Sequence, residues 1–450
     1  MAIEVPMNPK LARLSSNTIA LGLLVVLMGA LSARPLVCQQ KAPSRRDQEQ
    51  MVKRYLEVDC WTERGQEERI GILDRLSTVP ALDARQLKEW RRKIVNYWSK
   101  GRKLEKGGDN WYWPEGKDGK GVSTGRYIIG GKTKKPKGLA INMHGGGVGS
   151  GDAGGAASGY GSDLAKLDLL MIAPEVLKKT ECGWTDSGTE EFVLDLVDAA
   201  LRTWKIDPDR VYLVGHSMGG YGSWTLGGHH ADRVAAVAPS AGAPTPIRYK
   251  KGGPIMDVIE GVVPSLRNVF VAVYQSIDDP QVPPAPNQFA VKLLDSYAKK
   301  WGGFEHDYWE VDGRGHAAPP GGHFAHVQKI VEVERQVIPE RIVWQPALQW
   351  KRQFYYLYWE QPVLHSVLVA DLDRKANKVS ITCDKPTEGL YVLLDDRVLD
   401  LEKNVVVTVN GKETFRGKVQ PELKTLLLTS EHPDPELQFI ARAPAFPAGG

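Results

Sequence analysis

Ser217 lies in the motif GHSMG, at the point where an apolar run ends and a helical pattern begins. The run VYLVG precedes it, and Trp224 and Leu226 belong to the pattern that follows. A serine on a sharp strand-to-helix turn presents its hydroxyl outward and can act as a nucleophile. The same Gly-x-Ser-x-Gly spacing recurs at Gly121–Gly125, but a polar loop precedes that copy and a strand follows it. We therefore expect Ser217 to be the nucleophile and the other copy to be coincidental.

His316 is the histidine best placed to serve this serine. A serine hydroxyl needs a base to take its proton, and the base needs an acid to orient it. His316 lies in the glycine- and proline-rich loop DGRGHAAPPGGH, directly after the strand-like run HDYWEV. His323 and His326 are one helical turn apart on an expected surface helix, but no carboxylate stands nearby at ligand spacing. We expect His316 to be the base and expect no metal.

The acid should follow the preceding strand, where the chain reads QSIDDPQVPP. Asp278 and Asp279 are both candidates. Asp279 is favoured because Pro280 fixes the turn beside it, although Asp278 stays an alternative. The chain order serine, acid, histidine is the one expected for this topology.

Glycines after the run AINM could stabilise the negative charge that forms when a serine attacks a carbonyl. Backbone N–H groups that bind this oxyanion contribute a few kcal/mol. The amide of Met218, directly after the serine, is one expected donor. The second should come from the loop His144–Gly147, which reads HGGG, and either Gly146 or Gly147 could supply it.

Gly149, Gly151 and Gly154 match the GxGxxG spacing of dinucleotide-binding loops. That match is weak, because Gly145–Gly161 contains nine glycines and no helical pattern is visible from the third one. We expect neither a nucleotide nor another organic cofactor, and interpret the loop as a mobile rim over the pocket.

Strands alternate with helices through the middle of the chain. Strand-like runs are expected at 127–129, 139–143, 169–174, 210–215, 234–239, 268–274 and 306–311, with amphipathic helices over 192–204 and 289–301. Such alternation predicts an α/β fold with a doubly wound, mostly parallel sheet, whose functional loops lie at the carboxyl ends of the strands.

The flanking segments have a different character. Residues 34–120 are interpreted as a helical lead-in followed by a linker, in which Gly107–Gly121 is turn-rich and carries exposed aromatic residues. Residues 121–343 form the expected catalytic domain. Residues 344–450 hold short strand-like runs separated by turns, which predict a small all-β module of the sandwich kind.

Composition and charge point to an exported globular protein without a nucleic-acid partner. The chain is 42% apolar and 25% charged, and 58 basic residues against 54 acidic ones give a net charge of only +4. Met1–Ala33 has basic residues before a short apolar core, typical of a signal peptide, while an uncleaved anchor stays an alternative and would be the only contact with a membrane. The cysteines, Cys38, Cys60, Cys182 and Cys383, form no CxxC and suggest neither a disulfide framework nor a zinc site.

The ordered motifs resemble a known family. The stretch from about 122 to 338, with IDPDRVYLVGHSMGGYGSW, DPQVP and GRGH, resembles the α/β-hydrolase fold, in particular the branch with feruloyl esterases and polyhydroxybutyrate depolymerases and the catalytic domain of prolyl oligopeptidases. This resemblance implies Ser217, Asp279 and His316 as nucleophile, acid and base. Gln275 and Ser276 stand where the family usually has histidine and glycine, and residues 34–120 are too few for a propeller.

The sequence supports three functional hypotheses. The first is an exported serine esterase that acts on a small-molecule or polymeric ester through an acyl-enzyme. The second is a serine peptidase of the prolyl oligopeptidase kind with the same triad. The third is an inactive hydrolase domain in a binding protein, with a platform of aromatic residues in the β module; these are Trp350, Tyr355, Tyr356, Tyr358 and Trp359.

Overall fold

The structure, a computed structural model, describes residues 41–59, 62–117, 119–246, 249–250, 253–254 and 260–447. The expected leader Met1–Ala33, Cys38 and Cys60 lie outside the described residues. Contacts place Ala42–Gly450 in one compact unit, which contains every element named below. Within the described ranges, no helix combines the length and apolar character that crossing a bilayer would need.

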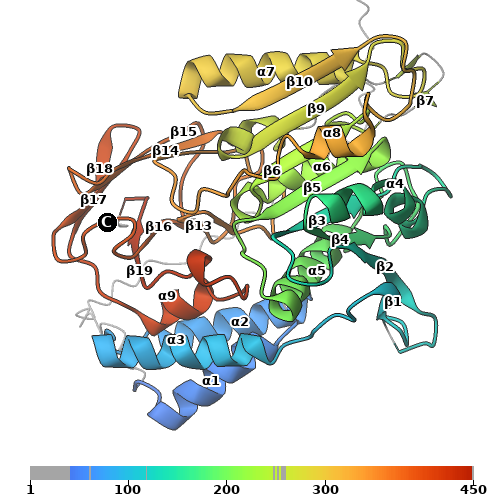
Figure 1. Cartoon of the computed structure of the whole chain (residues 1–450). Helices are drawn as coiled ribbons and strands as arrows, with labels where there is room; N and C mark the ends of the chain where they lie inside the picture. The colour runs from blue at the N-terminus through green and yellow to red at the C-terminus, as the bar shows by residue number, and fades with distance from the viewer. Residues whose placement is uncertain are drawn as a thin grey trace, which may run out of the picture. The chain divides into compact units, whose positions relative to one another are not determined.

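An eight-stranded sheet lies at the centre of this unit (Figure 1). Its strands are β1 (Gly108–Trp113), β2 (Thr124–Gly131), β3 (Gly138–Met143), β4 (Leu169–Pro174), β5 (Val211–His216), β6 (Ala236–Ser240), β9 (Phe270–Ser276) and β10 (His306–Val311). They lie in the order β1-β2-β4-β3-β5-β6-β9-β10, and only β2 runs opposite to the others. This is the strand order of the α/β-hydrolase fold, so the expected fold class is confirmed. A two-stranded ribbon, β7 (Tyr249–Lys250) and β8 (Gly253–Pro254), follows β6.

Helices cover both faces of the sheet, and the central strands are buried throughout. One face packs against α5 (Thr189–Trp204), α6 (Met218–His229), α7 (Ala285–Trp301) and the 3₁₀ helix η2 (Val263–Asn268). The other packs against α4 (Ala153–Lys166) and α8 (Gly322–Val327). Alternate strand residues serve the two cores: Ile141 and Leu213 face the first set of helices, whereas Ala140 and Tyr212 face the second. This two-sided burial explains why these strands are nearly continuous apolar runs.

The linker interpretation of Gly107–Gly121 was wrong for its first half. That half forms β1, which pairs with β2 at the edge of the sheet. Tyr112 is buried, and its ring packs edge-on against Phe192 of α5 with the centroids 5.6 Å apart, while Trp111 is exposed. An edge strand needs only one apolar face, and the turn residues after it hid that short alternation.

The glycine loop also differs from the prediction, because a helix does follow it. Asp152 caps α4 by accepting a hydrogen bond from the Gly155 N–H at 2.7 Å. Ala156, Tyr160 and Leu164 recur every fourth residue and form its buried face.

The lead-in is helical, as expected, and contacts the C-terminal part of the chain. It consists of α1 (Arg45–Glu57), α2 (Glu63–Leu76) and α3 (Ala84–Ser99), of which α2 and α3 lie beside α9 (Leu423–Leu428) in Figure 1. Arg69 of α2 bridges Glu431 at 3.2 Å, and Trp98 of α3 donates its indole N–H to the Ser430 carbonyl at 3.1 Å. The first and last segments of the unit therefore support each other.

The C-terminal module contains two small sheets and one helix, α9. The first sheet has the order β11-β14-β15-β17-β18 and the second the order β12-β13-β16-β19. Its strands are β11 (Arg341–Trp344), β12 (Gln353–Phe354), β13 (Leu357–Trp359), β14 (Leu368–Asp373), β15 (Lys378–Cys383), β16 (Leu390–Leu394), β17 (Val405–Val409), β18 (Lys412–Gly417) and β19 (Ala441–Pro444). The 3₁₀ helix η3 (Pro435–Leu437) precedes β19, and another, η1 (Ala231–Arg233), follows α6. The sequence predicted strands here but missed α9.

The aromatic residues of this module are core residues. Tyr355, Tyr356 and Trp359 are each at most 1% exposed, and Tyr358 is also buried. Trp350 is partly buried and stacks on the ring of His230 with the centroids 5.5 Å apart. Buried rings cannot serve as a sugar platform, so the structure removes the basis for that part of the third hypothesis.

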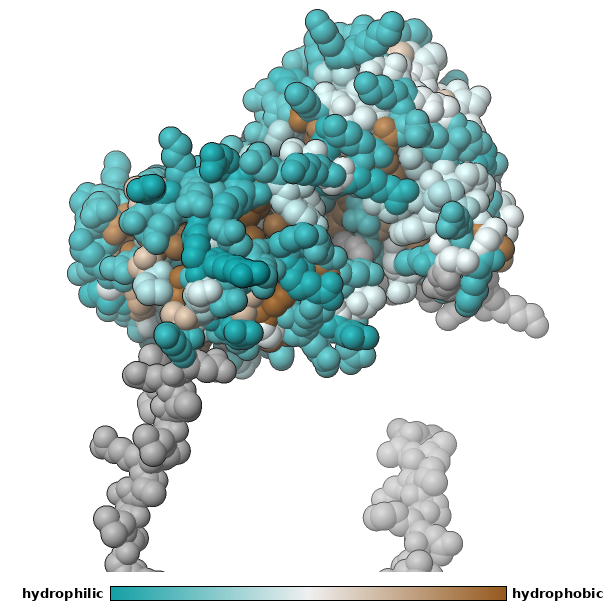
Figure 2. Space-filling model, turned by 90° about the horizontal axis from the view of Figure 1, so that it is seen from below, coloured by the Kyte–Doolittle hydropathy of each residue, from teal (hydrophilic) through white to brown (hydrophobic). Residues whose placement is uncertain are grey.

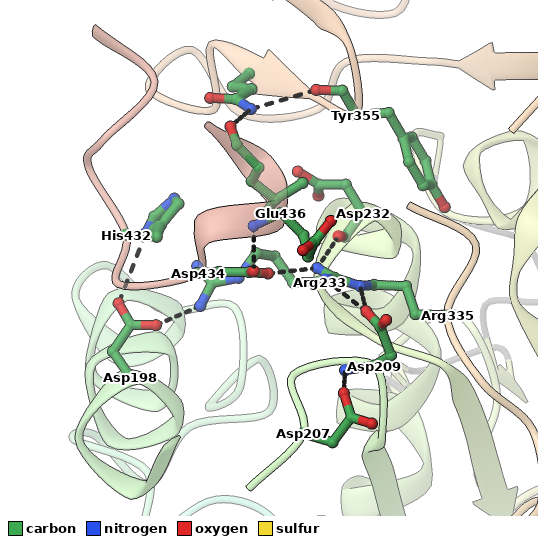
Figure 3. Close-up of polar contacts among 12 residues, drawn as sticks. Asp198, Asp207, Asp209, Asp232, Arg233, Arg335, Tyr355, His432, Asp434 and Glu436 are labelled. Atoms are coloured by element: carbon green, nitrogen blue, oxygen red, sulfur yellow. Dashed lines mark hydrogen bonds and ion pairs between the residues drawn. The ribbon is translucent and has the colours of Figure 1, made fainter. Parts of the chain in front are cut away.

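Buried ion pairs join the module to the hydrolase domain (Figure 3). Arg335 lies between Asp434 of the module, at 2.8 Å, and Asp209 of the loop before β5, at 2.7 Å. Asp198 of α5 contacts both Arg233 and His432, which belong to different parts of the chain. Because a buried charge needs a partner, these contacts require the module to stay in place.

Hydrophilic residues cover most of the face seen in Figure 2, and hydrophobic ones show mainly between them. Among the described residues, the large hydrophobic side chains that are exposed come from widely separated segments; they are Ile70, Val95, Trp111, Val122, Val148, Ile277, Phe289, Val363 and Leu364.

Candidate active site

Ser217 occupies the turn between β5 and α6, as its motif predicted. Its backbone has φ +61° and ψ −124°, a strained conformation for a residue with a side chain. The Ser217 N–H donates to the Ser240 carbonyl at 2.8 Å, which ties the turn to the neighbouring strand β6. A Cβ on Gly219 would lie 2.0 Å from the Met143 carbonyl oxygen, so only glycine fits there. The surrounding backbone thus forces the bend that exposes the serine.

Asp279 and His316 are brought together from two neighbouring strand ends. The Nδ1–H of His316 donates to Oδ2 of Asp279 at 2.7 Å, and the Asp279 side chain is fully buried. Its other oxygen, Oδ1, accepts the N–H groups of Gln281 and Val282 at 2.8 and 2.9 Å. The carboxylate is therefore fixed in place and orients the imidazole so that Nε2 is left free to accept a proton.

The His316 loop lies against the residue that directly precedes Ser217. The Nε2–H of His216 donates to the His316 carbonyl at 3.3 Å, and the centroids of the two imidazole rings are 4.9 Å apart. Within the described residues, the Ser217 hydroxyl itself makes no hydrogen bond to His316. Catalytic hydrogen bonds are often long before substrate binds and shorten in the substrate complex.

A cavity of about 340 Å³ contains the serine and all three expected oxyanion donors, Met218, Gly146 and Gly147. Met218 is the first residue of α6, so its N–H has no acceptor within the helix. Gly146 has φ +129°, and a Cβ there would lie 2.6 Å from the Ser150 carbonyl oxygen. The geometry leaves the choice between Gly146 and Gly147 open.

The glycine loop is held by side chains that the sequence did not single out. The Nδ1–H of His144 donates to the Gly145 carbonyl at 2.8 Å, and its Nε2 accepts the Val176 N–H at 3.2 Å. Burial lowers the pKa of His144, which keeps the ring neutral and able to make both bonds. The His144 carbonyl in turn accepts the indole N–H of Trp184 at 3.2 Å.

Gln275 makes the acid turn rigid despite departing from the family pattern. Its amide nitrogen donates to the Val282 carbonyl at 3.0 Å, and its oxygen accepts from Asn287 at 2.8 Å. Asn287 also accepts the indole N–H of Trp224 at 3.1 Å. This buried chain of hydrogen bonds joins α6, β9 and α7 behind Asp279.

The expected surface helix of His323 and His326 is instead packed on the sheet. The ring of His326 is buried and bonds the Ala272 carbonyl at 2.8 Å, and His323 stacks on Tyr160 with the centroids 3.7 Å apart. Burial lowers their pKa values to about 4 and about 3, so both rings are neutral. The helix has only six residues, too few to show in the sequence which side faces inward. Within the described ranges, no group of three or more His, Cys, Asp or Glu side chains is arranged to hold a metal ion.

Comparison with known proteins gives distant matches. No family model matches the chain, and no curated protein does. A thermostable esterase of known structure is 20% identical over 48% of this chain, with a TM-score of 0.36; the match spans 60% of that protein. A ferulic acid esterase from Anaeromyces mucronatus, solved with ferulic acid, is 16% identical over 52% of this chain and 95% of its own, with a TM-score of 0.35.

A proposed dipeptidyl aminopeptidase IV from Bacteroides ovatus is 12% identical over 47% of this chain and 34% of its own, with a TM-score of 0.36. At these scores, the fold assignment depends on the strand order of the main sheet.

Proposed function

We propose that this protein is a serine hydrolase that cleaves carboxylic esters through an acyl-enzyme intermediate. The observation that carries the proposal is the 2.7 Å hydrogen bond between Asp279 and His316, in a loop that contacts the strained turn of Ser217. A serine hydroxyl needs such a base, oriented by an acid, to act as a nucleophile.

The proposed reaction follows from the positions of these groups. The Ser217 hydroxyl attacks the ester carbonyl while His316 Nε2 takes its proton, and the N–H groups of Met218 and of Gly146 or Gly147 bind the oxyanion. When the C–O bond breaks, the imidazolium returns the proton to the departing alcohol. Water then attacks the acyl-serine with His316 again as base, which releases the acid and the free enzyme. This route needs neither a metal nor an organic cofactor.

The lining of the cavity favours an uncharged acyl group. Besides the reacting residues, the cavity is lined by small or apolar residues such as Val148, Ala243 and Val282. The polar side chains of Tyr221, Thr245 and Gln281 also line it, and they are uncharged. The carboxyl group of Glu181 also lines it. Both a small-molecule ester and a polymeric one are compatible with this lining.

Hydrolysis of p-nitrophenyl acetate and butyrate tests the proposal. Ser217→Ala should reduce kcat at least about 10³-fold, because the nucleophile is lost. Ser123→Ala is the matched control, since Ser123 stands in the other Gly-x-Ser-x-Gly motif and its hydroxyl donates to the Pro114 carbonyl. Equal loss in both variants, or none in Ser217→Ala, would show that the assignment is wrong.

A matched ester and amide pair separates esterase from peptidase activity. The wild-type kcat/KM should be higher for p-nitrophenyl acetate than for p-nitroacetanilide and for short peptide anilides. A higher value for the peptide anilides would make the oligopeptidase-like alternative correct. No turnover of any of these substrates would favour an inactive hydrolase domain.

We also propose that the protein is exported, because of the signal-like composition of Met1–Ala33. Cell fractionation of a tagged full-length chain should find it outside the cytoplasm, and a purely cytoplasmic location would contradict this.

A further inference from the structure

Asp278, the carboxylate not used by the imidazole, bonds the backbone of the histidine loop. Its Oδ1 accepts the N–H of Gly315 at 3.0 Å and the N–H of Arg314 at 3.2 Å. The same oxygen also accepts the hydroxyl of Ser276, whose Oγ lies 3.2 Å from the Arg314 N. The N–H groups of the two residues before His316 are thus bound to residues at and just after the end of β9.

The two adjacent aspartates hold different parts of the same histidine. Asp279 is buried and bonds the ring, whereas Asp278 is exposed and bonds the backbone that carries the ring. The hydrogen bond from Ser276, followed by that from the Gly315 N–H, holds the pKa of Asp278 below its usual range. Asp278 is therefore an ionised acceptor at neutral pH.

The loop needs such an anchor because its own conformation is permissive. Gly313 and Gly315 have φ values of +73° and +53°, and a Cβ at either would meet open space. Packing therefore does not fix this part of the loop. The Arg314 side chain donates to the Ala318 carbonyl at 2.9 Å within the loop, and it also interacts with the Tyr274 hydroxyl of β9.

We infer that Asp278 is a positioning residue for the catalytic base: by accepting the Arg314 and Gly315 N–H groups, it holds His316 at the distance from Ser217 that proton transfer requires. This rests on the proposed function of the triad. A displacement of about 1 Å in a catalytic group can cost about 100-fold in rate, so an exposed loop anchor can matter as much as a contact with substrate.

Two substitutions separate the acceptor from the charge. Asp278→Asn removes the charge and keeps an oxygen that can accept both N–H groups, whereas Asp278→Ala removes both. We expect Asp278→Ala to lower kcat on p-nitrophenyl acetate by about 10- to 100-fold with KM changed less than about twofold, and Asp278→Asn to stay within about threefold of wild type. Asp312→Ala is the control, because Asp312 is exposed on the same loop and, among the described residues, bonds only the adjacent Gly313 N–H, at 2.8 Å.

The pH dependence of kcat/KM in the two Asp278 variants gives a second measurement, which should not change if Asp278 only stabilises the fold. Misalignment of His316 with Asp279 should change the acid limb of the kcat/KM profile more in Asp278→Ala than in Asp278→Asn. Equal kcat and equal profiles in these two variants would assign the effect to charge and overturn the inference. So would a kcat in Asp278→Ala within twofold of wild type.

Amide hydrogen exchange tests the anchor without catalysis. The Arg314 and Gly315 N–H groups should exchange at least about tenfold faster in Asp278→Ala than in wild type or in Asp312→Ala. If the wild type proves inactive, the proposed function fails, but this measurement still shows whether Asp278 holds the loop. Unchanged exchange in Asp278→Ala would show that it does not. If Asp278→Ala does not fold, Ser276→Ala replaces it, because it removes the hydroxyl that orients Asp278. The Gly315 N–H is then the reporter, since Ser276 Oγ itself accepts the Arg314 N–H. Unchanged exchange in Ser276→Ala would then contradict the anchor.

Discussion

Neutralising Asp434 should destabilise the whole unit, because this carboxylate joins the C-terminal module to the hydrolase domain. Its side chain and that of Arg335 are each 1% exposed, and their Oδ2 and Nη1 atoms lie 2.8 Å apart (Figure 3). Asp434→Asn changes the charge but keeps an oxygen to accept the Glu436 N–H, which Asp434 caps at 2.9 Å. The substitution therefore isolates the ion pair from the local turn.

The expected loss of unfolding free energy depends on the partners that Arg335 retains in Asp434→Asn. Removing one partner of a buried ion pair typically costs about 3–5 kcal/mol. Arg335 would still contact Asp209 at 2.7 Å and the Asp232 carbonyl at 2.9 Å, so its charge stays partly compensated. We expect the lower end, about 3 kcal/mol, which is a large share of the roughly 5–15 kcal/mol that stabilises a typical domain.

Glu436→Gln is the matched control in the same turn. Glu436 pairs with Arg397 at 2.7 Å, but the two side chains are 46% and 33% exposed. Such a pair contributes less than about 1 kcal/mol. Urea unfolding followed by circular dichroism measures both variants, and the midpoint should shift clearly only in Asp434→Asn. Equal shifts in the two variants, or a loss below about 1 kcal/mol in Asp434→Asn, would refute the view that the buried pair locks the module in place.

Three further outcomes follow from the structure. Asp195→Asn should stabilise the protein more at pH 8 than at pH 5. Burial raises the pKa of Asp195 from 3.8 to about 7, so the folded wild-type protein holds this proton more tightly than the unfolded chain does. Between these two pKa values, the wild type therefore loses about 1.4 kcal/mol of stability per pH unit relative to Asp195→Asn as the pH rises. Equal urea midpoint shifts at the two pH values would contradict this. Gly219→Ala should yield no active protein, because its Cβ would clash with the Met143 carbonyl, and wild-type turnover in that variant would disprove the tight turn. Asp279→Asn should lower kcat by about 10³- to 10⁴-fold while urea stability falls far less, and a kcat near wild type would mean that the carboxylate does not orient the base.

The nucleophile turn could be predicted from the sequence because its signal is local. A strand, a serine with a glycine two residues away on each side and a helix follow one another without interruption around Ser217, and the structure has that order. The contact of Asp279 with His316 followed from a topological rule, since the carboxyl ends of neighbouring parallel strands meet at one edge of a sheet. Backbone bonding by Asp278 could not be foreseen, because it depends on the path of the loop in space.

The missed features depend on long-range packing. Helix α4 is rich in glycine, which disfavours a helix, yet packing on the sheet stabilises it. Strand β1 lies at an edge, and its apolar alternation is too short to detect. Arg335 and its partners Asp209 and Asp434 come from segments that are far apart in the chain, so no local pattern could reveal the pairing.

Labelling with a fluorophosphonate, followed by mass mapping of the modified peptide, tests the activated serine most directly. The account predicts one modified residue, Ser217, no labelling in Ser217→Ala, and labelling at least about 100-fold slower in His316→Ala. A label on any other residue, or an unchanged rate in His316→Ala, would contradict it.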